Sequence, residues 1–131
     1  MKEFYTMSLV EETKSLLAIC DECEQRFYTM RETDHSPEFF EEVKPYADRS
    51  HRAIADWSSD MKVWIKVAKP RYVHEVQIDS LKDSMTQFVV QSFYKETGKK
   101  RFILSINAAR YTLQTVLNAM GNENGEGRPN E

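Results

Sequence analysis

The sequence predicts an all-α protein that folds as an up-and-down, left-handed four-helix bundle, with a short extra helix before the second long one. Apolar residues recur at alternating steps of three and four along four segments, which places them on one stripe of a helix. The chain has only four glycines and four prolines among 131 residues, which favours long uninterrupted helices over many short strands. Because the repeat is close to 3.5 residues, we expect small crossing angles and a left-handed twist.

Each of the four segments carries its own apolar stripe. The stripes comprise Leu9, Thr13, Leu16, Cys20, Cys23, Phe27 and Met30; Ala47, Ser50, Ile54, Trp57, Met61, Trp64 and Ala68; Ile78, Leu81, Met85, Phe88 and Ser92; and Phe102, Ile106, Ala109, Leu113, Val116 and Met120. A strand would need alternation in steps of two, and no segment shows it. We expect these side chains to form one core, with each tryptophan N–H bonded to a carbonyl or to a stripe hydroxyl.

The residues between the stripes predict where the helices begin and end. Ser8 and Glu11 have the spacing of a capping box at the start of the first helix, with a start one turn earlier as the alternative. The Ser-Pro-Glu sequence at 36–38 is typical of a helix N-terminus and predicts a short helix that runs to about Lys44. Pro45 should then end this short helix, because it has no N–H and disfavours helical geometry at the residue before it.

The remaining boundaries follow from the same signals. We expect the second long helix over residues 45–68, the third over 74–96 and the fourth over 99–120, the last two ending at glycines. Short links between consecutive helices make them antiparallel neighbours. Residues 1–120 would then form the single bundle domain, and the polar residues 121–131 a disordered tail.

Composition and charge exclude several classes of function. The net charge is −3, with 18 basic and 21 acidic residues, whereas dedicated nucleic-acid binders usually have a basic excess. No apolar run approaches the ~20 residues that cross a bilayer, and the first residues lack the apolar core of a signal peptide. With two cysteines and no such signal, we expect a cytoplasmic protein whose partners are neither nucleic acids nor membranes.

Cys20 and Cys23 form a C-x-x-C pair, which can indicate redox chemistry or a metal site. A reactive cysteine of this kind needs a helix N-terminus to lower its pKa, but this pair is predicted in the middle of a helix. No second cysteine pair exists to complete a zinc site. Since both residues lie on the apolar stripe, we expect them to be small core residues.

Helical bundles can also hold two metal ions between inward-facing carboxylates and Glu-x-x-His pairs. Glu32 and His35 have this spacing but fall in a link, and Asp48 and His51 lie beside the stripe rather than on it. The stripes themselves contain no carboxylate. We therefore expect no metal and no other cofactor.

The all-α nucleotide pyrophosphohydrolases resemble this architecture and bind magnesium through paired E-x-x-E and E-x-x-D motifs. Glu38 and Glu41 match one half of such a pair. The third helix offers only Glu75 and Asp79, which are four residues apart. Because a magnesium site needs several converging carboxylates, this half-motif is weak support for that class of enzyme.

Basic residues gather at two places. Lys62, Lys66 and Lys69 share one face, as in helices that lie on membranes. Because Trp64 continues the stripe of the same helix, solvated lysines over a core helix are the favoured interpretation. A second cluster at 95–101 is predicted about 30 Å away, beside the acidic residues of the first link, where we expect mutual neutralisation.

Several segments of the chain carry a family likeness. They are DHSPEFFEEVKP at 34–45, Trp57, IKVAKPRYVHEVQI at 65–78, VQSF at 90–93, KKRF at 99–102 and YTL at 111–113. Together they resemble the YppE family of Bacillus and related Firmicutes. The resemblance spans residues 8–120 and implies a cytoplasmic four-helix bundle of uncharacterised function, with no catalytic residues to assign. The Cys20–Cys23 pair is not part of the pattern.

Two functions remain open, and the first is a non-enzymatic module that binds a protein partner. The predicted core is complete without an assembled active site, and the predicted contact residues are Lys69, Arg71, Tyr72 and His74. In the competing interpretation, Tyr72 packs over the end of the bundle, and His74 caps the third helix together with Gln77.

The alternative is a metal- or nucleotide-dependent hydrolase that uses Glu38, Glu41, Asp48 and His51. We favour the non-enzymatic module over this enzyme, because these four residues are not predicted to converge. We expect a monomer or a weak dimer, since any exposed apolar residue beside a stripe can form a dimer contact.

Overall fold

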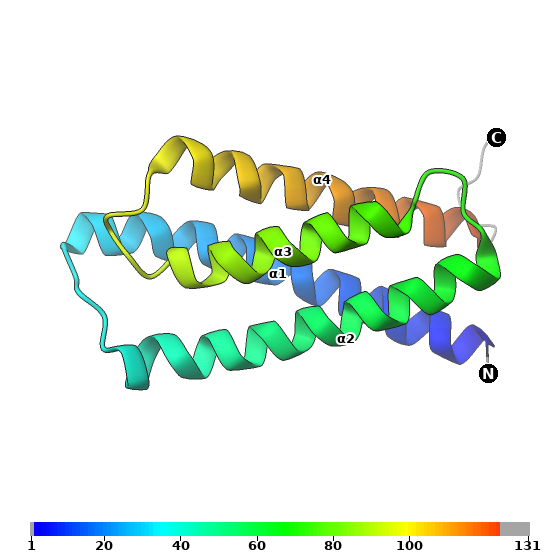
Figure 1. Cartoon of the computed structure of the whole chain (residues 1–131), viewed down its shortest axis with the longest axis horizontal. Helices are drawn as coiled ribbons and strands as arrows, with labels where there is room; N and C mark the ends of the chain where they lie inside the picture. The colour runs from blue at the N-terminus through cyan, green and yellow to red at the C-terminus, as the bar shows by residue number, and fades with distance from the viewer. Residues whose placement is uncertain (1, 124–131) are drawn as a thin grey trace.

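The structure is a computed structural model that describes residues 2–123, with side chains described from Leu9 to Gly121. Its four long helices are α1 (Lys2–Thr33), α2 (Lys44–Ala68), α3 (Glu75–Gln91) and α4 (Lys99–Glu123), and a single π-helical turn, η1 (Phe39–Val43), precedes α2. The described part of the chain contains no strand, so the all-α prediction is confirmed (Figure 1). None of its helices is long and apolar enough to cross a membrane.

Consecutive helices run up and down the bundle (Figure 1). α1 packs against α2 and α4, and α3 packs against the same two helices. The α1–α2 and α3–α4 links lie at one end, and the α2–α3 link lies at the other. The two basic clusters are therefore at opposite ends of the bundle, as the sequence predicts.

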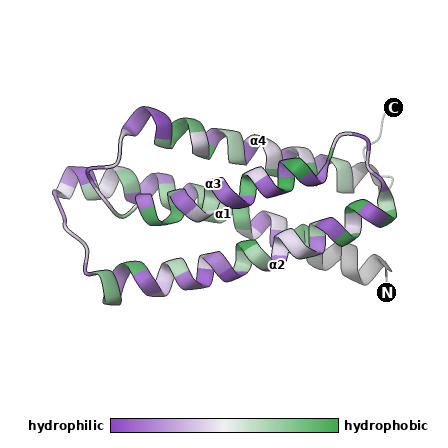
Figure 2. Ribbon diagram, in the orientation of Figure 1, coloured by the Kyte–Doolittle hydropathy of each residue, from purple (hydrophilic) through white to green (hydrophobic). Residues whose placement is uncertain are grey.

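The stripes of the four helices meet in one core. Every predicted stripe residue is buried except Ala68, which is half-buried. Apolar and polar residues consequently alternate along each ribbon in Figure 2. Phe27 stacks on Phe102 with 4.4 Å between ring centroids, which joins α1 to α4 in the centre. Burial of each large apolar side chain stabilises the fold by roughly 1.5–3 kcal/mol.

Thr13 provides the hydrogen bond that the largest core side chain needs. Its hydroxyl donates to the Leu9 carbonyl one turn earlier (2.8 Å) and accepts the indole N–H of Trp57 (2.9 Å). The prediction that a stripe hydroxyl pairs with a tryptophan is confirmed for Trp57. Because both groups are fully buried, loss of either would leave a polar atom without a partner.

Three helix boundaries differ from the prediction. α1 begins at Lys2, so Ser8 lies inside the helix and the predicted capping box does not start it. α3 ends at Gln91, because the chain leaves the helix in tight turns that bury Phe93. α4 continues through Gly121 to Glu123, since a single glycine costs a helix only about 1 kcal/mol. Residues 124–131 of the predicted tail lie outside the described residues.

The link between α1 and α2 also corrects the prediction. The short helix expected from Ser36 to Lys44 is present as the π turn η1, in which the Val43 N–H donates to the Glu38 carbonyl (3.3 Å). η1 runs directly into α2, so Pro45 does not separate the two helices; it occupies the first turn of α2, close to the predicted start at residue 45. A proline is tolerated there because its missing N–H would have no acceptor within the helix.

Ion pairs hold this link in place. Lys95 binds Asp34 with 2.6 Å between Nζ and Oδ1, and the hydrogen bond from Lys95 lowers the pKa of Asp34. His35 Nε2 lies 3.0 Å from Glu42 Oε1. The predicted neutralisation at this end of the bundle is confirmed for the Lys95–Asp34 pair.

Candidate functional site

The predicted contact residues Lys69, Arg71, Tyr72 and His74 lie on or beside the link between α2 and α3. Lys69 follows α2 in left-handed geometry, with φ 49° and ψ 56°. Tyr72 is 70% exposed, so the interpretation that it packs over the end of the bundle is wrong. The reason is that the neighbouring Val73 turns into the core instead and is only 2% exposed.

His74 starts α3 through the predicted capping box. Its backbone N–H donates to Gln77 Oε1 (2.6 Å), and the backbone N–H of Gln77 donates to the His74 carbonyl (3.0 Å). The capping interpretation of His74 is therefore confirmed. At the other end of the link, the Lys69 N–H donates to the Ile65 carbonyl (2.9 Å), so the backbone is held on both sides of Tyr72.

The positive charge of this region is only partly neutralised. Residues 62–74 contain four Lys or Arg residues and no acidic residue. Lys62 binds Asp79 across to α3 (2.7 Å), whereas Lys66, Lys69 and Arg71 form no ion pair with any described residue. We call the exposed group formed by Lys69, Arg71, Tyr72 and Val76 the α2–α3 end.

Cys20 and Cys23 are free thiols with no exposed surface. Burial raises the pKa of Cys20 to about 12 and raises the pKa of Cys23 as well. Both groups therefore stay protonated at neutral pH, and a protonated thiol is a poor nucleophile and metal ligand. The prediction that they are core residues is confirmed.

The residues of the hydrolase alternative do not converge. Asp48 is exposed and paired with Lys44 (2.8 Å), whose hydrogen bond lowers the pKa of Asp48. His51 Nε2 lies 3.1 Å from the Thr86 carbonyl of α3, and both glutamates of the E-x-x-E motif are exposed. Among the side chains that the structure describes, from Leu9 to Gly121, no three His, Cys, Asp or Glu residues come together as metal ligands.

A carboxyl pair that the sequence did not reveal joins α1 to α2. Burial raises the pKa of Glu12 to about 7, together with a hydrogen bond to Asp60 and the charges of Asp60 and Asp56. The Oε1 atom of Glu12 is buried without a hydrogen-bond partner among the described residues. The pair therefore shares a proton at neutral pH or below. No local sequence pattern identifies Glu12, because the carboxylates that raise its pKa, Asp56 and Asp60, lie on α2 and Glu12 lies on α1.

Arg26 closes the core at the end that carries the α1–α2 link. Its guanidinium lies 4.0 Å from the centre of the Tyr46 ring and 4.3 Å from that of Phe93, and Nη1 donates to Ser92 Oγ (3.0 Å). Such a cation between two aromatic faces is a stabilising arrangement. It also accounts for the early end of α3, because Phe93 has to leave the helix to reach Arg26.

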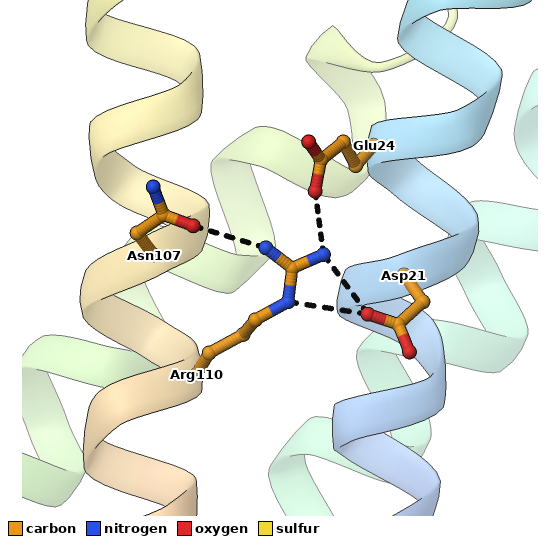
Figure 3. A network of polar contacts seen from close by, with 4 residues as sticks. All are labelled: Asp21, Glu24, Asn107 and Arg110. Carbon is orange, nitrogen blue, oxygen red and sulfur yellow. Dashed lines mark hydrogen bonds and ion pairs between the residues drawn. The ribbon is translucent and has the colours of Figure 1, made fainter.

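Arg110 ties α4 to α1 in a network of four residues (Figure 3). Its guanidinium donates to Asp21 Oδ1 from Nε (3.1 Å) and Nη2 (2.9 Å), and Nη1 donates to Asn107 Oδ1 (3.0 Å). Nη2 also contacts Glu24 Oε1 (2.5 Å). A signal for this residue does exist in the sequence, since Arg110 is the only charged residue between Phe102 and Asn122.

A shallow hollow of about 220 Å³ lies between α3 and α4. Short side chains line it, including Ser80 and Ser84 of α3 and Ala108 of α4. Leu104 and Tyr111 of α4 lie one turn before and after Ala108 and are 61% and 76% exposed. We call the surface formed by Val76, Ser80, Ser84, Leu104, Ala108 and Tyr111 the α3–α4 face.

Comparison with known proteins places the chain in a family. Residues 13–120 match the model of a bacterial domain of unknown function, DUF1798. The chain belongs to the DUF1798 family. It is 30% identical over 118 residues to the uncharacterized protein YppE of Bacillus subtilis. The aligned residues make up 90% of this chain and 96% of YppE. The likeness to the YppE family predicted from the sequence is confirmed.

Solved structures agree with the DUF1798 assignment. The crystal structure of YppE from Bacillus subtilis has a TM-score of 0.87 at 30% identity and covers 92% of this chain and 98% of its own. A protein of unknown function from Listeria innocua has a TM-score of 0.88 at 23% identity, with 94% and 98% covered, and this likeness shows the fold alone. The α2–α3 end and the α3–α4 face both fall inside the DUF1798 match.

Proposed function

We propose that this DUF1798 protein is a non-enzymatic, cytoplasmic interaction module whose α2–α3 end binds a segment of a partner protein. The observation that carries the proposal is the 70% exposure of Tyr72 beside two cations that have no carboxylate partner among the described residues. Tyrosine and arginine are the side chains most enriched among residues that dominate binding energy. Val76, which is 71% exposed, extends the apolar part of this surface.

The backbone of the α2–α3 end supports this proposal. The Lys69 N–H is bonded to the last turn of α2, the His74–Gln77 box begins α3, and Val73 is anchored in the core. Tyr72 is therefore presented on a segment that is already ordered. A partner gains affinity from such a surface because little conformational entropy is lost on binding.

Charge defines the partner's chemistry. The segment 62–74 has no acidic residue, so a complementary partner carries Asp or Glu beside an apolar side chain that contacts Tyr72. Opposite charges across an interface increase the association rate and exclude basic partners. We propose no hydrolase, because its four candidate residues lie apart.

The test is capture of partners from a cytoplasmic extract on the full chain, its Arg71→Ala/Tyr72→Ala variant and a matched Phe40→Ala/Arg52→Ala variant. Phe40 is 75% exposed and Arg52 is exposed, but both lie outside the α2–α3 end. We expect the wild type and the matched control to retain a partner that the Arg71/Tyr72 variant loses. Identical partners on all three proteins would overturn the assignment of this surface.

A further inference from the structure

The link between α1 and α2 carries a surface that complements the α2–α3 end. Residues 32–43 contain five acidic residues and no Lys or Arg, whereas residues 62–74 contain four Lys or Arg residues and no acidic residue. The link also exposes an aromatic pair, Phe39 at 48% and Phe40 at 75%, whose ring centroids lie 5.2 Å apart. We call the exposed group formed by Glu38, Phe39, Phe40 and Glu41 the α1–α2 turn.

Negative charge at this end of the bundle is only partly neutralised. Asp34 is paired with Lys95, and Glu42 lies next to His35. Three other exposed carboxylates form no ion pair with any described residue: Glu32, Glu38 and Glu41. Two of these three belong to the α1–α2 turn, so its exposed rings are flanked by free negative charge.

Cations at the same end do not cancel this charge locally. Lys44, which follows η1 directly, is already paired with Asp48 (2.8 Å). The next group of cations begins α4 at residues 99–101. Because α4 packs against α1 and α3, whereas η1 packs on α2, this group lies across the bundle from the α1–α2 turn.

The α2–α3 end has the opposite charge beside an aromatic ring of its own, the exposed Tyr72. Three cations there have no acidic partner among the described residues: Lys66, Lys69 and Arg71. The two nearest acidic residues of α3 act on Lys62 instead. The hydrogen bond to Asp79 raises the pKa of Lys62, and the charge of Glu75 adds to this effect.

We propose that the α1–α2 turn of one copy of the chain binds the α2–α3 end of a second copy. The turn has the chemistry expected of a partner for that end, because Glu38 and Glu41 flank two exposed rings. Its carboxylates meet unpaired cations, and its rings meet tyrosine and arginine, which pack favourably on aromatic faces. Like ends repel each other, so charge also decides which ends meet. The inference rests on the proposed function, because it adds a competitor for the same surface.

One chain cannot bring its own two surfaces together. They lie at opposite ends of the bundle (Figure 1), and α2, which separates them, has 25 residues and is therefore about 37 Å long. Contact needs two copies and joins unlike surfaces. Each copy keeps one surface free, so association is heterologous and continues head to tail beyond a dimer.

The small size of both surfaces sets the expected affinity. Each consists of a few side chains, so the contact is smaller than a stable interface. Exposed charges supply much of the attraction, and salt screens them. We expect weak, reversible association that decreases as the ionic strength rises. At high chain concentration, other copies would then compete with the partner protein for the α2–α3 end.

Sedimentation velocity of the purified full chain over roughly a hundredfold range of concentration tests the proposal, because association obeys mass action. At low salt we expect the average mass to rise past that of a dimer, and in about 1 M salt to return toward that of the monomer. The Arg71→Ala/Tyr72→Ala and Phe40→Ala/Glu41→Ala variants should each associate about fivefold or more weakly than the wild type. Thermal unfolding verifies that the variants are folded, as expected for four exposed side chains.

A mixture of these two variants identifies a contact between unlike surfaces. Each variant keeps one working surface, so each alone should stay largely monomeric, while their equimolar mixture should form dimers and nothing larger. Tyr111→Ala/Glu11→Ala is the matched control, because both residues are exposed but lie outside both surfaces. It should associate like the wild type.

A chain that stays monomeric at every concentration would overturn the proposal. So would a mixture of the two variants that stays monomeric, or a control that associates as weakly as they do. None of these results bears on the proposed function, which is tested in an extract. Native copies of the chain would bind all three baits there, because each bait keeps a working surface, so only a different protein that the Arg71/Tyr72 bait loses supports the proposed function.

Discussion

The Glu12–Asp60 pair leads to a specific prediction about stability and pH. In the folded chain, burial and the neighbouring Asp60 and Asp56 raise the pKa of Glu12 from 4.5 to about 7. The unfolded chain has no such surroundings, so its Glu12 has already lost its proton at pH 6. We expect Glu12→Gln to remove this difference, because an amide is neutral at every pH and can donate a hydrogen bond to Asp60.

The sign follows from proton binding. Between pH 4.5 and 7 the folded state holds a proton that the unfolded state has released, so the free energy of unfolding falls as the pH rises through this range. At full strength a pKa difference of this size corresponds to roughly 3 kcal/mol. Glu12 is partly exposed, and solvent screening reduces the expected effect to about 1 kcal/mol.

Urea unfolding followed by tryptophan fluorescence at pH 5, 6, 7 and 8 measures the effect. We expect Glu12→Gln to be about as stable as the wild type at pH 5 and about 1 kcal/mol more stable at pH 8. Glu11→Gln is the matched control, because Glu11 is the exposed neighbour on the same helix. If the stability difference between Glu12→Gln and the wild type did not change with pH, the shared proton would be refuted.

Further predictions concern the core and the helix boundaries. Thr13→Val leaves the buried indole N–H of Trp57 without its partner and should cost about 1–3 kcal/mol in urea unfolding; an unchanged midpoint would contradict this. Arg110→Met removes the ties between α4 and α1 at a part-exposed site and should cost about 1 kcal/mol, and no measurable loss would show that the network is energetically neutral. Pro45→Ala should change stability by no more than about 1 kcal/mol, whereas a larger loss would mean that the proline organises the link. Cys20 should react with a thiol reagent only as fast as the chain unfolds, and fast labelling of the native protein would disprove its burial.

The sequence predicted the core well because a stripe is a local property. The three-and-four spacing of Leu16, Trp57, Phe88 and Leu113 requires burial on one side of a helix, whatever the helices pack against. Short links then left little choice of connectivity. The YppE likeness rested on the same segments and was confirmed by the DUF1798 match.

Errors in the prediction came from residues whose effect depends on context. Pro45 was expected to separate the short helix from the second long helix, yet η1 runs directly into α2 with Pro45 in its first turn. α3 was expected to reach residue 96, but it ends at Gln91 because Phe93 packs against Arg26 from another helix. Tyr72 and Val73 are adjacent and both apolar in part, and local sequence did not decide which of them would be buried.

The amino-acid sequence by itself determined that this protein is an all-α bundle, which residues form its core, and that its cysteines are part of it. These features follow from the spacing of apolar residues, and that spacing is defined by residues close together in the sequence. The tertiary structure decided three other features: the exposure of Tyr72, the raised pKa of Glu12 beside Asp60, and the packing of Arg26 between Tyr46 and Phe93. Each of these requires residues from different helices to meet, or one of two neighbours to turn outward, and helix packing alone settles that.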